Sequence, residues 1–266
     1  MNDSFLLNLH GPVAHLQLNR PERANTLSPA FFTALREAVR GLCEGAAVRA
    51  LVISSTGAQF SAGLAAEAGS MPPNAPPADR RNPNESAARE AVGAILHMLD
   101  ERAAPGPGAA APPVQRLLDG LHVLGDAPFP VICAVQGACA GAALALACAC
   151  DIRVCSADAS FTPHGADPGA PPDPAVLQAV ARLLPPGPVH ELACTNEPLG
   201  AQRAHEWGFV NAVLPDAVAL TKHALALAER IAVRPFAAAS AAKLALRRTG
   251  ASDWGAPTAM APPARG

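Results

Sequence analysis

The chain has no tyrosine, two tryptophans and eight phenylalanines among its 266 residues, so aromatic side chains are scarce. Proteins that bind single-stranded nucleic acid stack the bases on aromatic rings and attract the phosphates with clustered positive charge. In this chain the formal net charge is −2 and the basic residues are scattered. The composition therefore argues against nucleic acid as a partner.

The chain also lacks a long hydrophobic run. Its longest apolar stretch, Ala138 to Cys150, has 13 residues, whereas a helix needs about 20 apolar residues to span a bilayer. The first residues, MNDSFLLNLHGP, have neither the basic region nor the apolar core of a signal peptide. We therefore expect a soluble, cytoplasmic protein without membrane contact.

The cysteines also lack the spacing of a metal-binding site. The seven cysteines are odd in number, and the local pair Cys148-x-Cys150 has no second pair or histidine cluster at the distance of a zinc site. We expect free thiols in a reducing compartment and no metal.

What the chain does have is apolar residues, which make up half of it. That is enough for one large domain with a substantial core. Its 28 prolines cluster at 72–77, 105–113 and 168–174, a pattern typical of loops between folded elements. We expect a mobile excursion over 70–113, with a helix near 86–101 inside it.

The N-terminal part predicts alternating strands and helices. Residues 13–19 alternate apolar and polar side chains, as a half-buried strand does. Ser28 followed by Pro29 is a helix start, and the apolar spacing predicts a helix over 29–45. A buried strand is expected at 48–54. This β-α-β beginning indicates an α/β protein.

The central run PVICAVQGACAGAALALACACDIRVCSADASF has the clearest pattern. It predicts a strand at 130–136, a turn of small residues, a helix at 141–149 and a strand at 152–157. A small-residue turn before a helix exposes backbone N–H groups and so forms an anion site. Further helices are expected at 174–184, 199–208, 216–232 and 235–248, with a strand at 209–215.

Several motifs in one order resemble the crotonase (enoyl-CoA hydratase/isomerase) superfamily. They are VAHLQLNRPERANTLS, FSAGL, the central run quoted above and EPLGAQRAHEWGFVNAVLPD. The resemblance covers about residues 10–67 and 128–248. It implies an α/β fold, a spiral of ββα units (1–200) with a C-terminal helical trimerisation region (201–250). A disordered tail would follow (251–266).

The resemblance also implies a substrate and a binding geometry. The substrate would be an acyl thioester on coenzyme A or on the pantetheine arm of an acyl carrier protein, and no other cofactor is expected. Two backbone N–H groups would hold the thioester carbonyl, and by motif position these belong to Leu64 and Ala142. The neighbouring Ala62, Gly63 and Gly141 would then line the substrate. The expected assembly is a homotrimer or a dimer of trimers.

The chain departs from the family where the hydratases carry two glutamates. Those positions fall on Ala145, in GAALAL, and on Gly165, in FTPHG. Adding water to an enoyl thioester needs a positioned acid and a positioned base. The departure therefore argues against ordinary hydration. It favours decarboxylation, or dehydration and isomerisation, of an acyl thioester.

A subgroup that decarboxylates thioesters in polyketide β-branching also resembles this chain. Its members have an F-S-T-G-G-x-x-E-G motif where this chain reads FSAGLAAEAG, and a Gln-Gly pair like Gln136-Gly137. The tyrosine of its substrate loop has no counterpart here. On the strength of the shared motifs, we expect an enzyme, a lyase or isomerase, of polyketide or other secondary metabolism.

Three side chains are candidates for moving protons. His164 lies beside the vacant glutamate position and titrates near neutral pH; a loop histidine in solvent is the alternative. Asp167 is either functional or a turn former before Pro168. Glu67 is either a substrate contact or a surface charge, and Gly165 itself would line the substrate.

Two other functions stay open. Because both carboxylates are missing, the chain could be a degenerate homologue that serves as a binding or scaffold subunit. Alternatively, it could hydrate enoyl-CoA with other acid–base residues. Turnover of a panel of acyl thioesters separates these alternatives.

Overall fold

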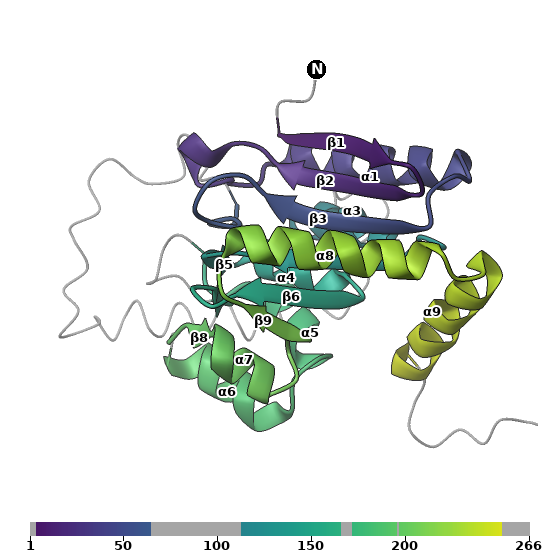
Figure 1. The fold of residues 1–266 in the computed structure, drawn as a ribbon. Coiled ribbons are helices and arrows are strands. Elements are labelled where there is room, and N and C mark those ends of the chain that lie inside the picture. Colours follow the sequence, from purple (N-terminus) through teal and green to yellow (C-terminus); the bar gives the residue numbers. More distant parts are fainter. Residues whose placement is uncertain (1–3, 65–112, 166–171, 196, 252–266) are drawn as a thin grey trace, which may run out of the picture.

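Two β-sheets organise the part of the chain that the computed structural model describes, residues 4–64, 113–165, 172–195 and 197–251 (Figure 1). The larger sheet has six strands in the spatial order β1 (Phe5–His10), β2 (Val13–Leu18), β3 (Ala50–Ser55), β4 (Val131–Val135), β6 (Ile152–Ser156) and β9 (Ala212–Leu214). The smaller sheet has three, in the order β5 (Ala138–Ala140), β7 (Ser160–Thr162) and β8 (Leu199–Gly200). The pairs β1–β2 and β7–β8 are antiparallel, and the other pairs are parallel.

The α-helices of the described residues alternate with these strands along the chain. Their bounds are α1 Pro29–Glu44, α3 Pro113–Asp126, α4 Ala142–Ala149, α5 Pro174–Ala181, α6 Pro186–Thr195, α7 Ala201–Glu206, α8 Ala217–Ala232 and α9 Phe236–Ala251. A short 3-10 helix covers Pro21–Arg23. None of the described helices is both long enough and apolar enough to cross a bilayer.

A repeated ββα unit sets the topology. In the unit β4–β5–α4 the first strand joins the larger sheet and the second joins the smaller sheet, and β6–β7–α5 repeats this arrangement. Winding these units one after another produces the spiral that the family resemblance predicts. The fold class expected from the sequence is therefore confirmed.

The predicted start of α1 is also confirmed. The Ser28 hydroxyl accepts a hydrogen bond from the Phe31 amide at 3.3 Å, and Pro29 is the first helical residue. Such a cap satisfies one of the amides that a helix start leaves unpaired. One face of the helix is buried, comprising Phe31, Phe32, Leu35, Val39 and Leu42.

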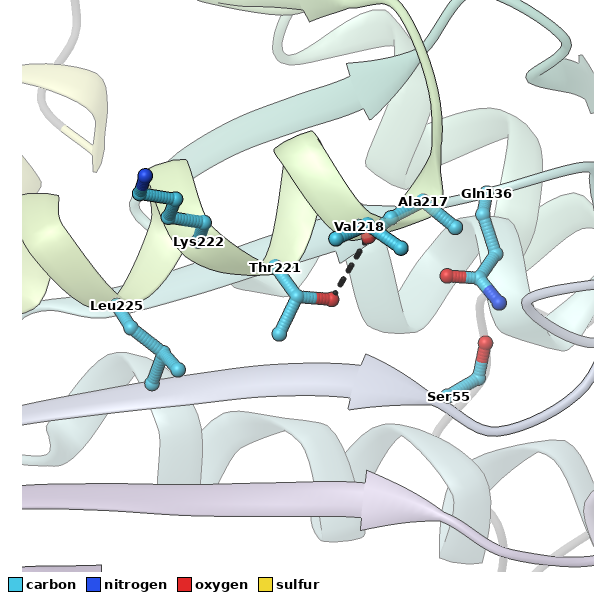
Figure 2. A pocket seen from close by; sticks show the side chains of 7 residues that line it. All are labelled: Ser55, Gln136, Ala217, Val218, Thr221, Lys222 and Leu225. Carbon is cyan, nitrogen blue, oxygen red and sulfur yellow. Dashed lines mark hydrogen bonds between the residues drawn. The ribbon is translucent and has the colours of Figure 1, made fainter.

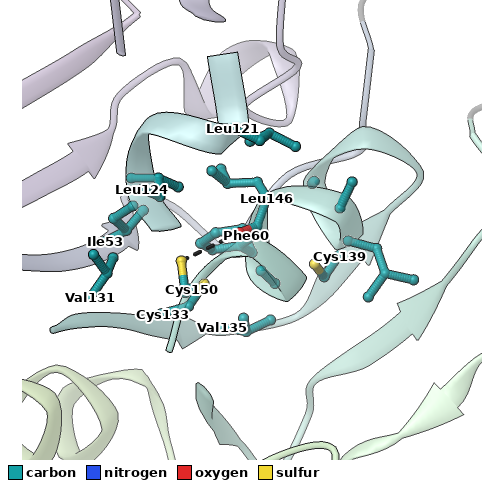
Figure 3. Packing of buried hydrophobic residues seen from close by; sticks show 14 of the residues in the cluster. Ile53, Phe60, Leu121, Leu124, Val131, Cys133, Val135, Cys139, Leu146 and Cys150 are labelled. Carbon is teal, nitrogen blue, oxygen red and sulfur yellow. Dashed lines mark hydrogen bonds between the residues drawn. The ribbon is translucent and has the colours of Figure 1, made fainter. Parts of the chain in front are cut away.

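The larger sheet buries apolar side chains on both of its faces. On one face the main core includes Ile53, Phe60, Cys133 and Leu146 (Figure 3). On the other face α8 packs across the strands, with Leu220, Ala224 and Ala228 against Val13 and Val52. Helix α8 therefore completes the core of its own chain.

An ion pair holds α9 at the end of the sheet. The Lys243 ammonium lies 2.7 Å from the Asp151 carboxylate and donates to the carbonyl oxygens of Leu124, at 2.8 Å, and Phe129, at 2.9 Å. Lys243 is buried. Its four-carbon chain thus links α9 to the start of β6 and to the end of α3.

Some elements were not predicted. Strand β1 (FLLNLH) has two adjacent leucines, which interrupt the alternation of a strand. Helix α3 starts at Pro113, in a proline cluster that we interpreted as a loop although proline also favours the first helical position. Helix α6, which starts at Pro186, was not predicted either.

The predicted mobile excursion (70–113) and the predicted disordered tail (251–266) each overlap a helix by one residue. Pro113 opens α3 rather than ending the excursion, and α9 extends to Ala251. The remainder of the 70–113 excursion, its expected helix at 86–101 and residues 252–266 lie outside the described part of the chain.

Candidate active site

The loop from Phe60 to Leu64 lies alongside the smaller sheet. The Ser61 amide donates to the Ala138 carbonyl at 3.0 Å, and the Ala140 amide donates back to the Ser61 carbonyl at 3.1 Å. The buried Ser61 hydroxyl accepts a hydrogen bond from the Gly63 amide at 3.1 Å. Gly63 has a φ of +92°, a backbone conformation that residues other than glycine rarely adopt. These contacts fix the peptides that precede Leu64.

A second tight turn joins β5 to α4. Gly141 has a φ of 51° and a ψ of −118°, and its amide donates to the Thr162 carbonyl at 2.9 Å. Helix α4 then begins at Ala142. The amides of a first helical turn have no partner within the helix and carry the positive end of its dipole. The turn therefore presents donors, as the sequence predicts.

The two turns touch each other. A Cβ added to Gly63 would stand 2.8 Å from the Ala140 carbonyl oxygen and 3.7 Å from the Ala142 amide nitrogen. Among the described residues, no group accepts a hydrogen bond from the Leu64 amide or from the Ala142 amide. The structure thus brings the turn at Ala62, Gly63 and Leu64 against the turn at Gly141 and Ala142, and among the described residues the Leu64 and Ala142 amides have no acceptor.

Residues 164 and 165 form a third side of this arrangement. A Cβ added to Gly141 would stand 3.3 Å from the Gly165 Cα and 3.6 Å from the His164 carbonyl oxygen. His164 is 6% exposed, and its Nδ1 is buried without a hydrogen-bond partner among the described residues. Burial lowers the pKa of His164 below its ordinary value of 6.5. The alternative of a solvent-facing histidine is therefore wrong.

A family model described as enoyl-CoA hydratase/isomerase matches residues 97–256, more than half of the chain. The chain belongs to the enoyl-CoA hydratase/isomerase family.

Relatives within this family include isomerases and dehydratases. The mitochondrial Delta(3,5)-Delta(2,4)-dienoyl-CoA isomerase of Rattus norvegicus is 30% identical over 235 residues, covering 88% of this chain and 65% of that protein. Carnitinyl-CoA dehydratase of Salmonella paratyphi A is 31% identical over 215 residues, covering 80% of this chain and 69% of that protein. The chain thus spans slightly less than two thirds of the dienoyl-CoA isomerase.

Solved structures of the family share the fold. The crystal structure of an enoyl-CoA hydratase from Mycobacterium smegmatis has a TM-score of 0.73 and 26% identity, covering 94% of this chain and 85% of that one. Human enoyl Coenzyme A hydratase domain-containing protein 3 has a TM-score of 0.71 at 23% identity, covering 94% of this chain and 86% of that one. The crotonase fold is therefore confirmed.

The two positions assigned to the hydratase glutamates carry no carboxylate in this member of the enoyl-CoA hydratase/isomerase family. Ala145 is buried in the core beside Leu144 and Leu146. Gly165 is exposed, and a Cβ added there would meet no atom within 4 Å. The candidates Asp167 and Glu67 lie outside the described residues. Within the described ranges, no three His, Cys, Asp or Glu side chains gather closely enough to hold a metal ion.

One residue that positions the first turn was missed by the sequence analysis. Asn25 is buried with a φ of 52°, and its side-chain amide donates to the carbonyls of Thr56, at 2.8 Å, and Gln59, at 2.9 Å. Next to it, the Ala62 amide donates to the Ala24 carbonyl at 3.0 Å. The sequence feature that could have pointed to Asn25 is its place in the RANTLS motif, because asparagine adopts the left-handed conformation more readily than most residues.

A groove of about 580 Å³ lies between the first half of α8 and the ends of β3 and β4 (Figure 2). Two polar side chains of its lining are already engaged, since Ser55 donates to the Gln59 carbonyl at 3.0 Å and Gln136 donates to the Gly57 carbonyl. Among the described residues of its lining, Lys222 is the one titratable group. The groove offers no donor pair for a thioester carbonyl.

The buried thiols are unsuited to nucleophilic catalysis. Burial raises the pKa of Cys155 to about 12, with a smaller contribution from Asp158. Burial also raises the pKa of Cys139, which lies one residue before Ala140 and its turn. Because the thiolate is the nucleophilic form, these cysteines act as small apolar side chains.

Proposed function

We propose that this chain is an enzyme that polarises an acyl thioester with the Leu64 and Ala142 amides and shifts a carbon–carbon double bond in the acyl group. The observation that supports this proposal is the contact of the two turns, in which neither the Leu64 amide nor the Ala142 amide has an acceptor among the described residues. Removing a proton next to a thioester places negative charge on the carbonyl oxygen. Preorganised donors stabilise such charge by several kcal/mol, about 3 for a single donor.

The missing carboxylates favour a double-bond shift over hydration. Hydration needs one group to activate water and another to deliver a proton to carbon. A 1,3-shift needs a single group that takes a proton from one carbon and returns it to another. With Ala145 in the core and Gly165 bare, a two-carboxylate mechanism has no residues at those positions. The dienoyl-CoA isomerase relative at 30% identity supports the same choice.

Decarboxylation of a β-carboxyacyl thioester is the second candidate. The two missing carboxylates favour it as well, because the C–C bond breaks without any base and leaves its electron pair on the enolate. Only a proton donor is then required. The resemblance to the polyketide β-branching subgroup points the same way, and dehydration of a 3-hydroxyacyl thioester belongs to the same class of enolate chemistry.

Mass spectrometry of four thioester classes tests these proposals. The panel consists of 3-enoyl, 2-enoyl, 3-hydroxyacyl and β-carboxyacyl groups, each on coenzyme A and on a phosphopantetheinylated carrier protein. Conversion of the 3-enoyl to the 2-enoyl thioester without water addition is the expected result. Loss of CO₂ from the β-carboxyacyl thioester alone would select decarboxylation. Binding of every thioester with no turnover would select the scaffold function and overturn the enzyme proposal.

The assembly is a separate proposal. We expect three copies, or two such trimers, as the family resemblance implies. Light scattering coupled to gel filtration measures the mass directly, and a 27.0 kDa species would contradict the trimer.

A further inference from the structure

One buried polar atom of the loop beside the two turns has no evident structural role. The His164 Nδ1 is inaccessible and meets no hydrogen-bond partner among the described residues, and the residue as a whole is 6% exposed. Buried polar atoms in folded proteins almost always have a partner, and the exceptions call for an explanation such as a catalytic role. If the His164 side chain only filled space in the core, an apolar side chain would fill it equally well and would leave no polar atom unpaired.

The position of His164 provides that explanation. Its carbonyl oxygen lies 3.6 Å from the point where a Cβ on Gly141 would stand, so the residue adjoins the turn that begins α4. The next residue, Gly165, has open space at its Cβ position. The site therefore has room at Gly165, the residue after His164, and, among the described residues that form it, no other side chain that titrates near neutral pH.

We propose that the His164 imidazole is the catalytic group that moves the proton in the double-bond shift; this inference rests on the function proposed above. A ring nitrogen takes a proton from C2 of a 3-enoyl thioester. The electrons of that C–H bond form the C2–C1 double bond, and the carbonyl electrons move to the oxygen held by the Leu64 and Ala142 amides. The dienolate then takes the same proton back at C4, which yields the 2-enoyl thioester and the neutral ring.

The surroundings of the ring suit both steps. Desolvation lowers the pKa of His164, and no charged group among the described residues contributes to the shift. The ring is therefore neutral at pH 7, the form that accepts a proton. Once protonated, it lies near the dienolate, whose negative charge stabilises the imidazolium in a site of low dielectric constant.

The test compares His164→Gln and His164→Ala with the wild type and with His122→Gln. His122 is an exposed histidine on α3 and serves as the matched control. With a 3-enoyl thioester of coenzyme A, the His164 variants should lose about 10²–10⁴-fold in kcat with little change in KM. The control should stay within about twofold, as is usual for surface changes. Thermal unfolding by circular dichroism checks that each variant is folded.

A pH profile supplies a readout that a purely structural role would not move. Wild-type kcat should fall in acid, at a pH lower than the ordinary histidine value of 6.5, because burial lowers the pKa of His164, and this limb should be missing from any residual activity of His164→Gln. If the wild type isomerises and the variant does so equally well, His164 is not the base and the proposed function stands. A wild type that turns over none of the thioesters rejects the function and the role of His164 together. Should the variants fail to fold, a wild-type profile without the acidic limb overturns the role of His164.

Discussion

Gly141 lies against Gly165, with only 3.3 Å between the Gly165 Cα and the point where a Cβ on Gly141 would stand. This contact joins the turn that carries the Ala142 amide to the loop that carries His164. Both turns of the site are therefore positioned by main-chain contacts. Side-chain changes at Ala142 and Gly165 leave these contacts in place. Binding of the carbonyl oxygen and acid–base chemistry can therefore be tested separately.

Replacing Ala142 by proline removes one proposed donor while keeping the helix. Ala142 is the first residue of α4, a position where proline is favoured because its missing N–H has no helical partner. We expect Ala142→Pro to lower kcat by about 10²–10³-fold, the usual loss for one oxyanion donor. Steady-state kinetics with a 3-enoyl thioester measure it.

Ala217→Pro is the matched control, since Ala217 is the first residue of α8 and follows Asp216, a capping residue in an extended conformation. It should leave kcat unchanged. Equal losses in both variants would mean that proline disturbs the fold and that the Ala142 amide has no special role.

Gly165 has space for the carboxylate that the family's hydratases carry. Because an added Cβ meets no atom within 4 Å, Gly165→Glu should fold normally. If the Leu64 and Ala142 amides bind the thioester as proposed, the new carboxylate should raise hydration of a 2-enoyl thioester by about 10–10²-fold, less than an optimised acid–base group supplies.

Gly165→Gln and Gly200→Glu are the controls for this gain. The first keeps the size of the side chain without its charge, and the second adds a carboxylate at another glycine with open space. Neither should gain hydratase activity. Hydration that rises equally in Gly165→Gln would show that the effect is not acid–base catalysis.

The strands and helices of the centre could be predicted from the sequence because local pattern determines them. The run 130–157 combines apolar strands with a turn of small residues, and the structure places β4, α4 and β6 there. The unpaired amide of Ala142 follows from its place at the start of a helix, which the sequence also shows. Local signals therefore carried both the fold and half of the proposed donor pair.

Contacts across long sequence distances could not be predicted. Asn25 anchors the loop through the carbonyl of Gln59, 34 residues away, and Gly63 packs against the turn at Ala140, 77 residues away. The burial of His164 depends on such contacts as well. A sequence pattern shows which residues could act, but the direction of a loop side chain depends on partners that are distant along the chain.

The Lys243–Asp151 ion pair should contribute strongly to stability. Removing one partner of a buried pair leaves an uncompensated charge and costs about 3–5 kcal/mol. The Asp151 side chain is 25% exposed and also accepts from the Val131 amide at 2.8 Å. Because Asp151, which stays behind, is partly exposed, the main cost of Lys243→Met is the loss of the hydrogen bonds to the Leu124 and Phe129 carbonyls. We therefore expect this substitution to lower the free energy of unfolding by about 1–3 kcal/mol.

Arg247→Met is the comparison for this prediction, because Arg247 pairs with Asp126 at 2.6 Å in an exposed position on the same helix. Exposed pairs contribute about 0–1 kcal/mol. Urea unfolding measures both changes. A Lys243→Met loss as small as that of Arg247→Met would show that α9 is not held by the buried pair.

His15 should make the stability of the protein fall in mild acid. Its Nε2 lies 2.8 Å from the Ser54 hydroxyl, and desolvation, with a smaller contribution from the charge of His10, lowers its pKa from 6.5. Below pH 6.5 the unfolded chain therefore takes up a proton that the folded chain refuses, and unfolding becomes easier until the pH reaches the folded pKa. Above pH 6.5 both states are neutral at this position, and His15 adds no pH dependence.

His15→Gln keeps a polar partner for Ser54 but does not titrate. The free energy of unfolding, measured by urea between pH 5 and pH 8, should therefore depend less steeply on acid in this variant than in the wild type. Part of the dependence should persist, since His164 is also buried with a lowered pKa, and the double variant with His164→Gln should remove that part too. A His15→Gln curve parallel to that of the wild type would mean that His15 is protonated equally in the folded and unfolded chains, which contradicts its burial beside Ser54.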